Sequence, residues 1–149
     1  MHRSSLLLLS AAVIAPLWSG TSALAQIPCI NGFAGGYPCE NIDLLAHMTL
    51  AQLGASGSQP NAADLWGWTD PLTGREYAIV GLNNGTAFVD VTVPTAPVRI
   101  GNLPSHFATS NLWRDVDVAG TWCYIGSELA GHGLQVFDLT RLRNVPNPP

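Results

Sequence analysis

The stretch that decides the fold is a β-rich segment that occurs twice. Trp66–Pro104 reads WGWTDPLTGREYAIVGLNNGTAFVDVTVPTAPVRIGNLP, and Trp113–Pro149 reads WRDVDVAGTWCYIGSELAGHGLQVFDLTRLRNVPNPP. Like residues recur at a nearly constant distance: Trp66 and Trp113, and Tyr77 and Tyr124, at 47 positions, and Asp90 and Asp138 at 48 positions. A period of this length, built from short β patterns, is typical of β-propeller blades.

Each copy divides into short strands separated by turn residues. In the first copy we expect strands at 65–69, 76–82, 86–91 and 98–103. Asn83-Asn84-Gly85 predicts a tight hairpin, because Asn and Gly accept positive φ. The second copy predicts strands at 113–118, 121–127 and 133–139, with no fourth strand before the sequence ends. We therefore predict an all-β protein of four-stranded antiparallel blades of the β-propeller type, with the second blade incomplete.

An incomplete propeller leaves open blade edges. Repeat arrays shorter than about three units rarely bury enough surface to be stable. We therefore expect the chain to be the N-terminal fragment of a longer propeller. Two alternatives remain: self-association through the open blade edges, or a small open β stack.

The N-terminus has the features of a secretory signal peptide. A short basic region at His2 and Arg3 precedes an apolar run at 6–14, and Ala23-Leu24-Ala25 matches a cleavage site. The apolar run is too short to span a membrane, so no membrane span is expected after cleavage. We expect an exported protein (extracellular, on the cell surface or periplasmic) divided into a signal peptide (1–25), a leader (26–63), a first blade (64–104) and a truncated blade (105–149).

Composition argues against a nucleic-acid partner. Removing the first 25 of 149 residues leaves 124, with no lysine and with five arginines against ten acidic residues. The arginines are scattered along the chain. Nucleic-acid binding depends on clustered cations, so this class of partner is disfavoured.

Three cysteines remain in the exported chain. Cys29 and Cys39 bound a loop rich in glycine, and an oxidising compartment favours a disulfide between them. The alternatives are two free thiols or a pairing that uses Cys123. Cys123 lies in a strand-like run, where it is expected to be a small buried apolar residue.

Few residues have spacings that predict chemistry. Asp115 and Asp117 share one face of a strand and could contribute to a Ca²⁺ site, although two carboxylates are too few for it. Their other interpretation is hydrogen bonding to a loop backbone or a neighbouring blade. His132, in Gly131-His132-Gly133, is a further weak metal candidate, but no zinc-type spacing supports it. No cofactor is expected.

Two further groups of residues are candidates for a functional role. Ser110 or Ser127 with His106 or His132 could be imagined as a hydrolase site, but the Gly-x-Ser-x-Gly elbow is absent. Trp66 and Trp113 occupy corresponding positions of the repeat, which favours core packing for both, while Trp68 and Trp122 are more open to other roles. The parts in which the copies differ carry the candidate ligand contacts, at His106, Glu128 and His132.

The motifs resemble a known family. REYAIVGLNNGTAFVDVTVPTAPVRIGNLP is similar to an LVIVD repeat. The leader CINGFAGGYPCENIDLLAHMTL, the segment from DLWGWTDP to LPSH, WRDVDV and AGHGLQVFDLTRLRNV follow the order seen in choice-of-anchor B proteins. The resemblance implies an exported multi-blade propeller attached to the cell surface through a C-terminal anchor, with no catalytic residues to carry over.

Together these expectations favour an exported, non-catalytic interaction protein that binds an extracellular protein or carbohydrate through its loops. The alternatives are an extracellular hydrolase or lyase whose site lies in blades beyond this sequence, and a structural component of the cell surface.

Overall fold

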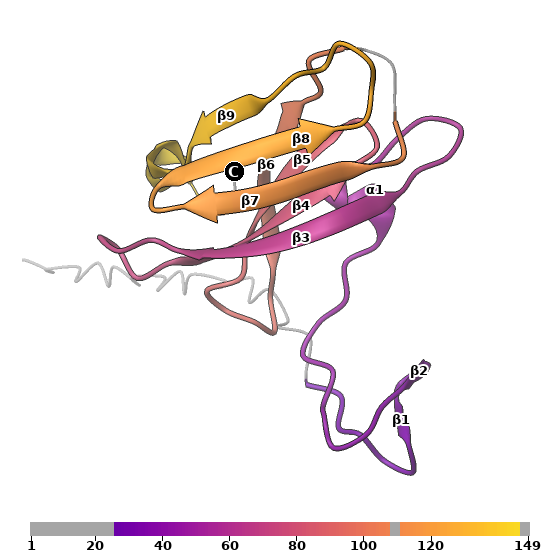
Figure 1. Cartoon of the computed structure of the whole chain (residues 1–149). Coiled ribbons are helices and arrows are strands. Elements are labelled where there is room, and N and C mark those ends of the chain that lie inside the picture. Colours follow the sequence, from indigo (N-terminus) through magenta and orange to yellow (C-terminus); the bar gives the residue numbers. More distant parts are fainter. Residues whose placement is uncertain (1–25, 108–110, 147–149) are drawn as a thin grey trace, which may run out of the picture.

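The computed structural model describes residues 26–107 and 111–146, so the expected signal peptide lies outside the described residues. The described chain is all-β with antiparallel sheets, as predicted (Figure 1). The first sheet contains β3 (Ala62–Thr69), β4 (Glu76–Leu82), β5 (Gly85–Asp90) and β6 (Val98–Pro104) in that order. The second contains β7 (Arg114–Ala119), β8 (Trp122–Ser127) and β9 (Gln135–Asp138), which are the three strands predicted for the second copy.

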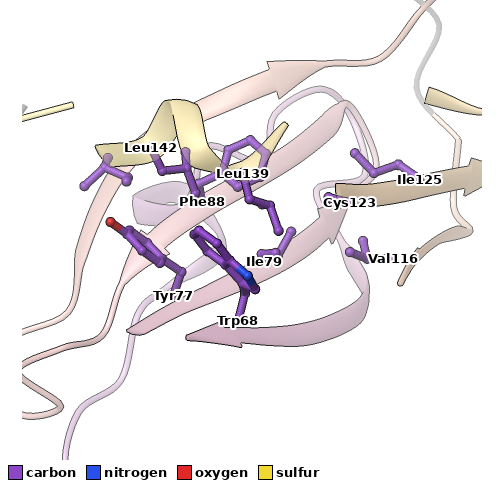
Figure 2. Close-up of a cluster of buried hydrophobic side chains, with 10 residues drawn as sticks. Trp68, Tyr77, Ile79, Phe88, Val116, Cys123, Ile125, Leu139 and Leu142 are labelled. Atoms are coloured by element: carbon purple, nitrogen blue, oxygen red, sulfur yellow. The ribbon is translucent and has the colours of Figure 1, made fainter. Parts of the chain in front are cut away.

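The two sheets enclose the main core (Figure 2). Alternate residues of β4 and β8 point into it, because successive side chains of a strand leave opposite faces. Its buried members are Trp68, Tyr77, Ile79, Phe88, Ile100, Val116, Cys123, Ile125, Leu139 and Leu142. Among the described residues these sheets do not close into a ring.

The hydrogen-bond ladders show which residues of the two sheets correspond. Asp90 ends β5 and Asp138 ends β9, and each accepts from the backbone N–H two residues further on. Their ladder partners are Tyr77 on β4 and Trp122 on β8. The two aspartates are thus equivalent, in agreement with their 48-residue spacing. Tyr77, however, corresponds to Trp122 and not to Tyr124, so the pairing of the two tyrosines by spacing was wrong.

Unequal turns explain the error. The β3–β4 connection has six residues (70–75) and the β7–β8 connection only two (120–121), whereas β4–β5 has two (83–84) and β8–β9 has seven (128–134). Equivalent positions are consequently 51 apart in the first strands, 45 apart in the second and 48 apart in the third. The constant 47-residue spacing in the sequence therefore does not identify structurally equivalent positions.

The expectation that Trp66 and Trp113 are core residues was also wrong. Trp66 is 43% exposed and Trp113 is 53% exposed, whereas Trp68 is buried and stacks on Tyr77. Trp66 lies on the edge strand β3, and Trp113 precedes β7. Trp66 shares the face of β3 that carries Trp68, but its side chain stays partly exposed on this edge strand.

The N-terminal leader contains the predicted disulfide. Cys29 and Cys39 are joined with their Cα atoms 5.9 Å apart, around the two-residue strands β1 (Phe33–Ala34) and β2 (Tyr37–Pro38). Figure 1 shows this hairpin extending away from the two sheets. A disulfide is consistent with an extracellular or periplasmic location.

For the segment at 41–53 the apolar pattern predicts a strand or an irregular run; it is irregular at 41–49 and forms the short helix α1 (Leu50–Leu53) at its end. Thr49 and Gln52 form a reciprocal capping box, and Gly54 ends the helix at a φ of 92°. No helix of residues 26–107 and 111–146 is long and apolar enough to cross a membrane.

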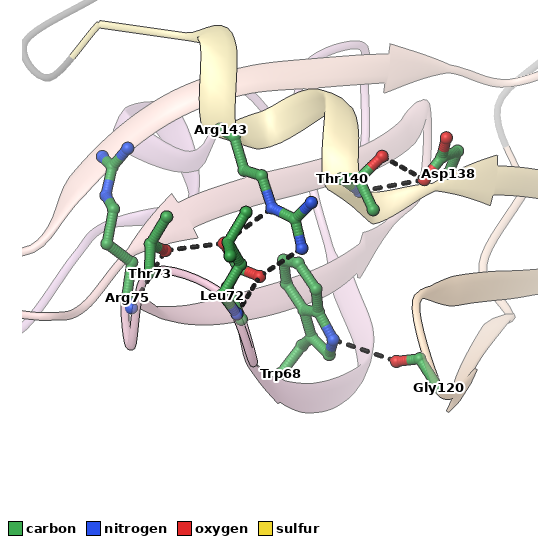
Figure 3. A network of polar contacts seen from close by, with 9 residues as sticks. Trp68, Leu72, Thr73, Arg75, Gly120, Asp138, Thr140 and Arg143 are labelled. Atoms are coloured by element: carbon green, nitrogen blue, oxygen red, sulfur yellow. Dashed lines mark hydrogen bonds and ion pairs between the residues drawn. The ribbon is translucent and has the colours of Figure 1, made fainter.

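A 3-10 helix, η1 (Leu139–Asn144), follows β9. Arg143 of this helix reaches the first sheet and donates two hydrogen bonds to the carboxylate of Asp70, at 2.8 and 2.5 Å (Figure 3). Thr73 donates to the same carboxylate. This ion pair connects the end of the second unit to the β3–β4 turn of the first.

Candidate functional site

A buried arginine organises one end of both sheets. This end, which we call the loop end, is where β4, β6 and β8 finish and β5, β7 and β9 begin. Arg114 starts β7 and is 1% exposed. It occupies the same face of β7 as Val116, so its side chain points toward the first sheet.

The guanidinium of Arg114 has only neutral hydrogen-bond acceptors. Its Nε donates to the carbonyl of Leu82 at 2.9 Å, and one terminal nitrogen donates to Ser105 Oγ at 2.9 Å. The other terminal nitrogen lies 3.1 Å from His132 Nε2 and 3.5 Å from Gln135 Oε1. Burial lowers the pKa of Arg114. No carboxylate compensates the charge within the described part of the chain, and this is unusual for a buried cation.

His132 is part of this cluster. It is 5% exposed, and its Nδ1 lies 3.0 Å from the carbonyl of Gly133. Since that carbonyl can only accept, Nδ1 carries the proton and Nε2 accepts from Arg114. Both ring nitrogens are therefore used within the protein.

The other two predicted contact residues lie at the same end. His106 is exposed, and its ring centroid is 6.4 Å from that of His132, so the structure brings these two histidines together. Glu128 is exposed in the β8–β9 connection. Large apolar side chains at this end are also exposed: Phe107 (41%), Leu112 (47%), Trp113 (53%) and Leu134 (62%).

Asp115 and Asp117 lie elsewhere. Both are exposed on the side of β7 that faces away from the first sheet, and Asp117 Oδ1 accepts from the N–H of Val118 at 2.7 Å. Over residues 26–107 and 111–146, no group of three or more His, Cys, Asp or Glu residues could hold a metal ion. The structure therefore adds no third ligand to this pair or to His132.

The imagined hydrolase group is not assembled in the described residues. Ser127 Oγ donates to the carbonyl of Trp113 and accepts from the N–H of Leu129, so it serves the turn after β8. No hydrogen bond joins Ser127 to either histidine in that part of the chain. Ser110 lies outside the described residues.

The β4–β5 hairpin forms as predicted, but by a different mechanism. None of Asn83, Asn84 and Gly85 has the positive φ that the prediction assumed, and side-chain contacts outside the hairpin hold it instead. The side-chain amide of Asn83 donates to the carbonyl of Ser56, and that of Asn84 donates to the carbonyl of Gly54. The hairpin tip is thereby held beneath the leader.

Sequence reasoning missed the fixed base of the loop end, formed by Arg114, Ser105 and Gln135. One signal was available. The alternation of WRDVDV places Arg114 on the same face as two valines, which indicates a buried cation. Ser105 and Gln135 have no such signal, because their role depends on where the sheets bring Arg114.

Comparison with protein-family models, curated proteins and solved structures gives no match for this chain.

Proposed function

We propose that the protein is an exported, non-catalytic interaction module that binds an extracellular carbohydrate or protein at its loop end. The observation that carries the proposal is the contrast between a rigid base and an exposed rim. Arg114 ties the segment after β6 to the β8–β9 connection through Ser105 and His132. Phe107 and Trp113 then lie exposed on segments whose ends are fixed.

Such an arrangement suits recognition. Exposed aromatic side chains offer large apolar surfaces with few rotatable bonds, so they lose little conformational entropy on binding. Glu128 and His106 add hydrogen-bonding groups beside them. Hydroxyl-rich sugars and polar peptide segments both match this combination of aromatic faces and polar groups.

The two sheets fit adjacent blades of a propeller of the LVIVD-repeat kind, and the motif order fits the choice-of-anchor B family. Their consecutive antiparallel strands and equivalent ladder positions support this assignment. Export is supported by the sequence of residues 1–25 and by the disulfide between Cys29 and Cys39. In this proposal the chain presents its loop end outside the cytoplasm.

The test is binding of the purified protein to an oligosaccharide microarray and to a phage-displayed peptide library. We expect a restricted set of ligands, and Trp113→Ala should weaken their binding by about tenfold or more. Trp66→Ala is the matched control, because Trp66 is similarly exposed but lies in the middle of β3. Absence of any selected ligand, or equal weakening by the two substitutions, would contradict the proposal.

A further inference from the structure

One hydrogen bond at the loop end depends on the charge of a histidine. A terminal nitrogen of Arg114 lies 3.1 Å from His132 Nε2, and a guanidinium can only donate, so Nε2 must accept. On the other side of the ring, the carbonyl of Gly133 lies 3.0 Å from Nδ1 and can only accept. The two neighbours therefore require the same form of the ring, which is neutral and carries its proton on Nδ1.

A second proton has no place in this arrangement. On Nε2 it would face an N–H of Arg114, and two positive groups would meet at nitrogens 3.1 Å apart. His132 is 5% exposed and Arg114 is 1% exposed, so little water is present to screen the repulsion. The folded contact therefore needs neutral His132, whereas a connection released from Arg114 accepts either form. Acid consequently favours release.

The charged groups around His132 do not offset this effect. On β7, Arg114 is the charged residue that faces the ring, since Asp115 lies on the opposite side of the strand. On the segment after β6, the exposed His106 has its ring centroid 6.4 Å away, and it carries a positive charge when it is protonated. Glu128, on the same connection as His132, is exposed, and in the described part of the chain no hydrogen bond or ion pair joins the two.

The chain around His132 can move without breaking the second sheet. Gly131 and Gly133 flank it at φ values of 80° and 68°, a region that glycine enters freely, and both lie outside β8 and β9. A methyl group on Gly131 would lie 3.7 Å from the ring of Phe107, so this exposed ring rests against the connection. Release of His132 from Arg114 would therefore also move the connection away from Phe107 on the rim.

We propose that protonation of His132 opens the loop end, by separating the β8–β9 connection from Arg114 and from the rim. The opening occurs in mildly acidic solution, within the range of about pH 8 to 5 in which histidine side chains change charge. The ion pair between Asp70 and Arg143 persists there, because the guanidinium holds the pKa of Asp70 well below its ordinary value. Regulation of ligand binding by this opening rests on the proposed function, but the opening itself does not.

Amide hydrogen exchange of the purified protein tests the opening. It is followed by mass spectrometry at about pH 7.5 and about pH 5 and corrected for the intrinsic effect of pH on exchange. The reporter is the connection at 128–134, in which the N–H of His132 donates to the carbonyl of Leu129. We expect its exchange to rise by about tenfold or more at the lower pH, while the β4–β5 hairpin stays protected.

Three variants identify the group that titrates. His132→Gln removes the titration and keeps an acceptor, because Gln Oε1 can take the place of Nε2 opposite Arg114. Its exchange should be the same at both pH values. His106→Gln should keep most of the wild-type response, because His106 makes no hydrogen bond to Arg114 among the described residues. His47→Gln is the matched control, because His47 is exposed in the leader.

Nitrogen NMR of the wild-type histidine side chains is a second measurement, and it does not require a variant to fold. At neutral pH His132 should carry its proton on Nδ1, and its protonation should coincide with the rise in exchange. The proposal is overturned if exchange at 128–134 is the same at both pH values, if His132→Gln keeps the full response, if His106→Gln abolishes it, or if Nε2 carries the proton at neutral pH.

An oligosaccharide or peptide selected in the binding test extends the experiment. Its affinity for the wild-type protein should fall by about tenfold or more at about pH 5, and its affinity for His132→Gln should stay constant. If no ligand is selected, the proposed function fails, while hydrogen exchange still decides whether the loop end opens. If a ligand binds and exchange does not change with pH, the opening alone is contradicted.

Discussion

The indole N–H of Trp68 donates to the carbonyl oxygen of Gly120 at 3.0 Å, across 52 positions of sequence (Figure 3). This bond connects the end of β3 with the β7–β8 turn, so it holds the two sheets together at the end opposite Arg114. The Trp68 ring also stacks on Tyr77, with centroids 5.4 Å apart. The first sheet is thereby attached to the second at both ends.

We expect Trp68→Phe to lower the free energy of unfolding by about 1–3 kcal/mol, since it removes both the hydrogen bond and part of the buried ring. Urea unfolding followed by circular dichroism measures the change. Trp66→Phe should cost less, because Trp66 is 43% exposed whereas Trp68 is 6% exposed. Equal losses in the two variants would show that the contact with Gly120 contributes nothing.

A second pair of variants tests the close approach at Gly81. An added methyl group there would clash with the backbone of Arg114, and backbone cannot move as freely as a side-chain end. We expect Gly81→Ala to destabilise the protein by about 1–3 kcal/mol. Gly126→Ala, at the equivalent position, should leave the stability of the monomer unchanged or slightly raised, and thermal unfolding of dilute protein distinguishes the two.

Acid should weaken the attachment of η1 to the first sheet. The Arg143 guanidinium lowers the pKa of Asp70 far below the ordinary value of 3.8. Since the folded pKa is the lower one, the carboxylate stabilises the fold fully above about pH 4, and this stabilisation is lost as the pH falls below it.

Arg143→Gln should therefore make the stability of the protein less sensitive to pH between about pH 5 and pH 2. Urea unfolding at several pH values is the measurement. Arg141→Gln is the matched control, because Arg141 lies on the same short helix and is exposed. An identical acid response in wild type and Arg143→Gln would show that the ion pair between Asp70 and Arg143 does not cause the loss of stability in acid.

The three cysteines should behave differently. Burial raises the pKa of the Cys123 thiol to about 11, so it should not react with thiol reagents at neutral pH until the protein unfolds. Titration of the unfolded, unreduced chain should then find one free thiol. Finding three would exclude the disulfide between Cys29 and Cys39.

Opening that disulfide should affect the leader alone. The bridged hairpin makes its contacts within the leader, including an antiparallel bridge between Ile27 and Leu44. We expect the double substitution Cys29→Ser and Cys39→Ser to change the unfolding free energy of the sheets by less than about 0.5 kcal/mol. A large fall would mean that the disulfide-bonded hairpin supports the sheets.

The sequence predicted the strands well because their signals are local. Alternation in Glu76–Leu82 and the turn residues around it suffice to place β4 and its hairpin. The equivalence of Trp66 and Trp113 failed because it rested on a constant spacing, although the predicted strands already have connections of unequal length: six residues between 69 and 76, and two between 118 and 121. Their exposure likewise depends on which sheet covers which strand.

The loop end was predicted only in part for the same reason. His106 and His132 were found because they lie in segments where the two copies differ. Arg114 was missed as the group that fixes them, because its acceptors come from three separate segments: Leu82, Ser105 and the run from His132 to Gln135. Such a cluster exists only after the sheets have packed.

The seven-residue β8–β9 connection is five residues longer than its β4–β5 counterpart, and it carries both Glu128 and His132. The ladders on either side of it keep the same pairing as in the first unit. The β8–β9 connection therefore lengthens the loop end of the second sheet while the pairing of its two strands stays the same. The length of this connection is thus independent of the strand pairing that holds the second sheet together: an insertion at that tip changes the exposed surface of the loop end and leaves the β8–β9 ladder intact.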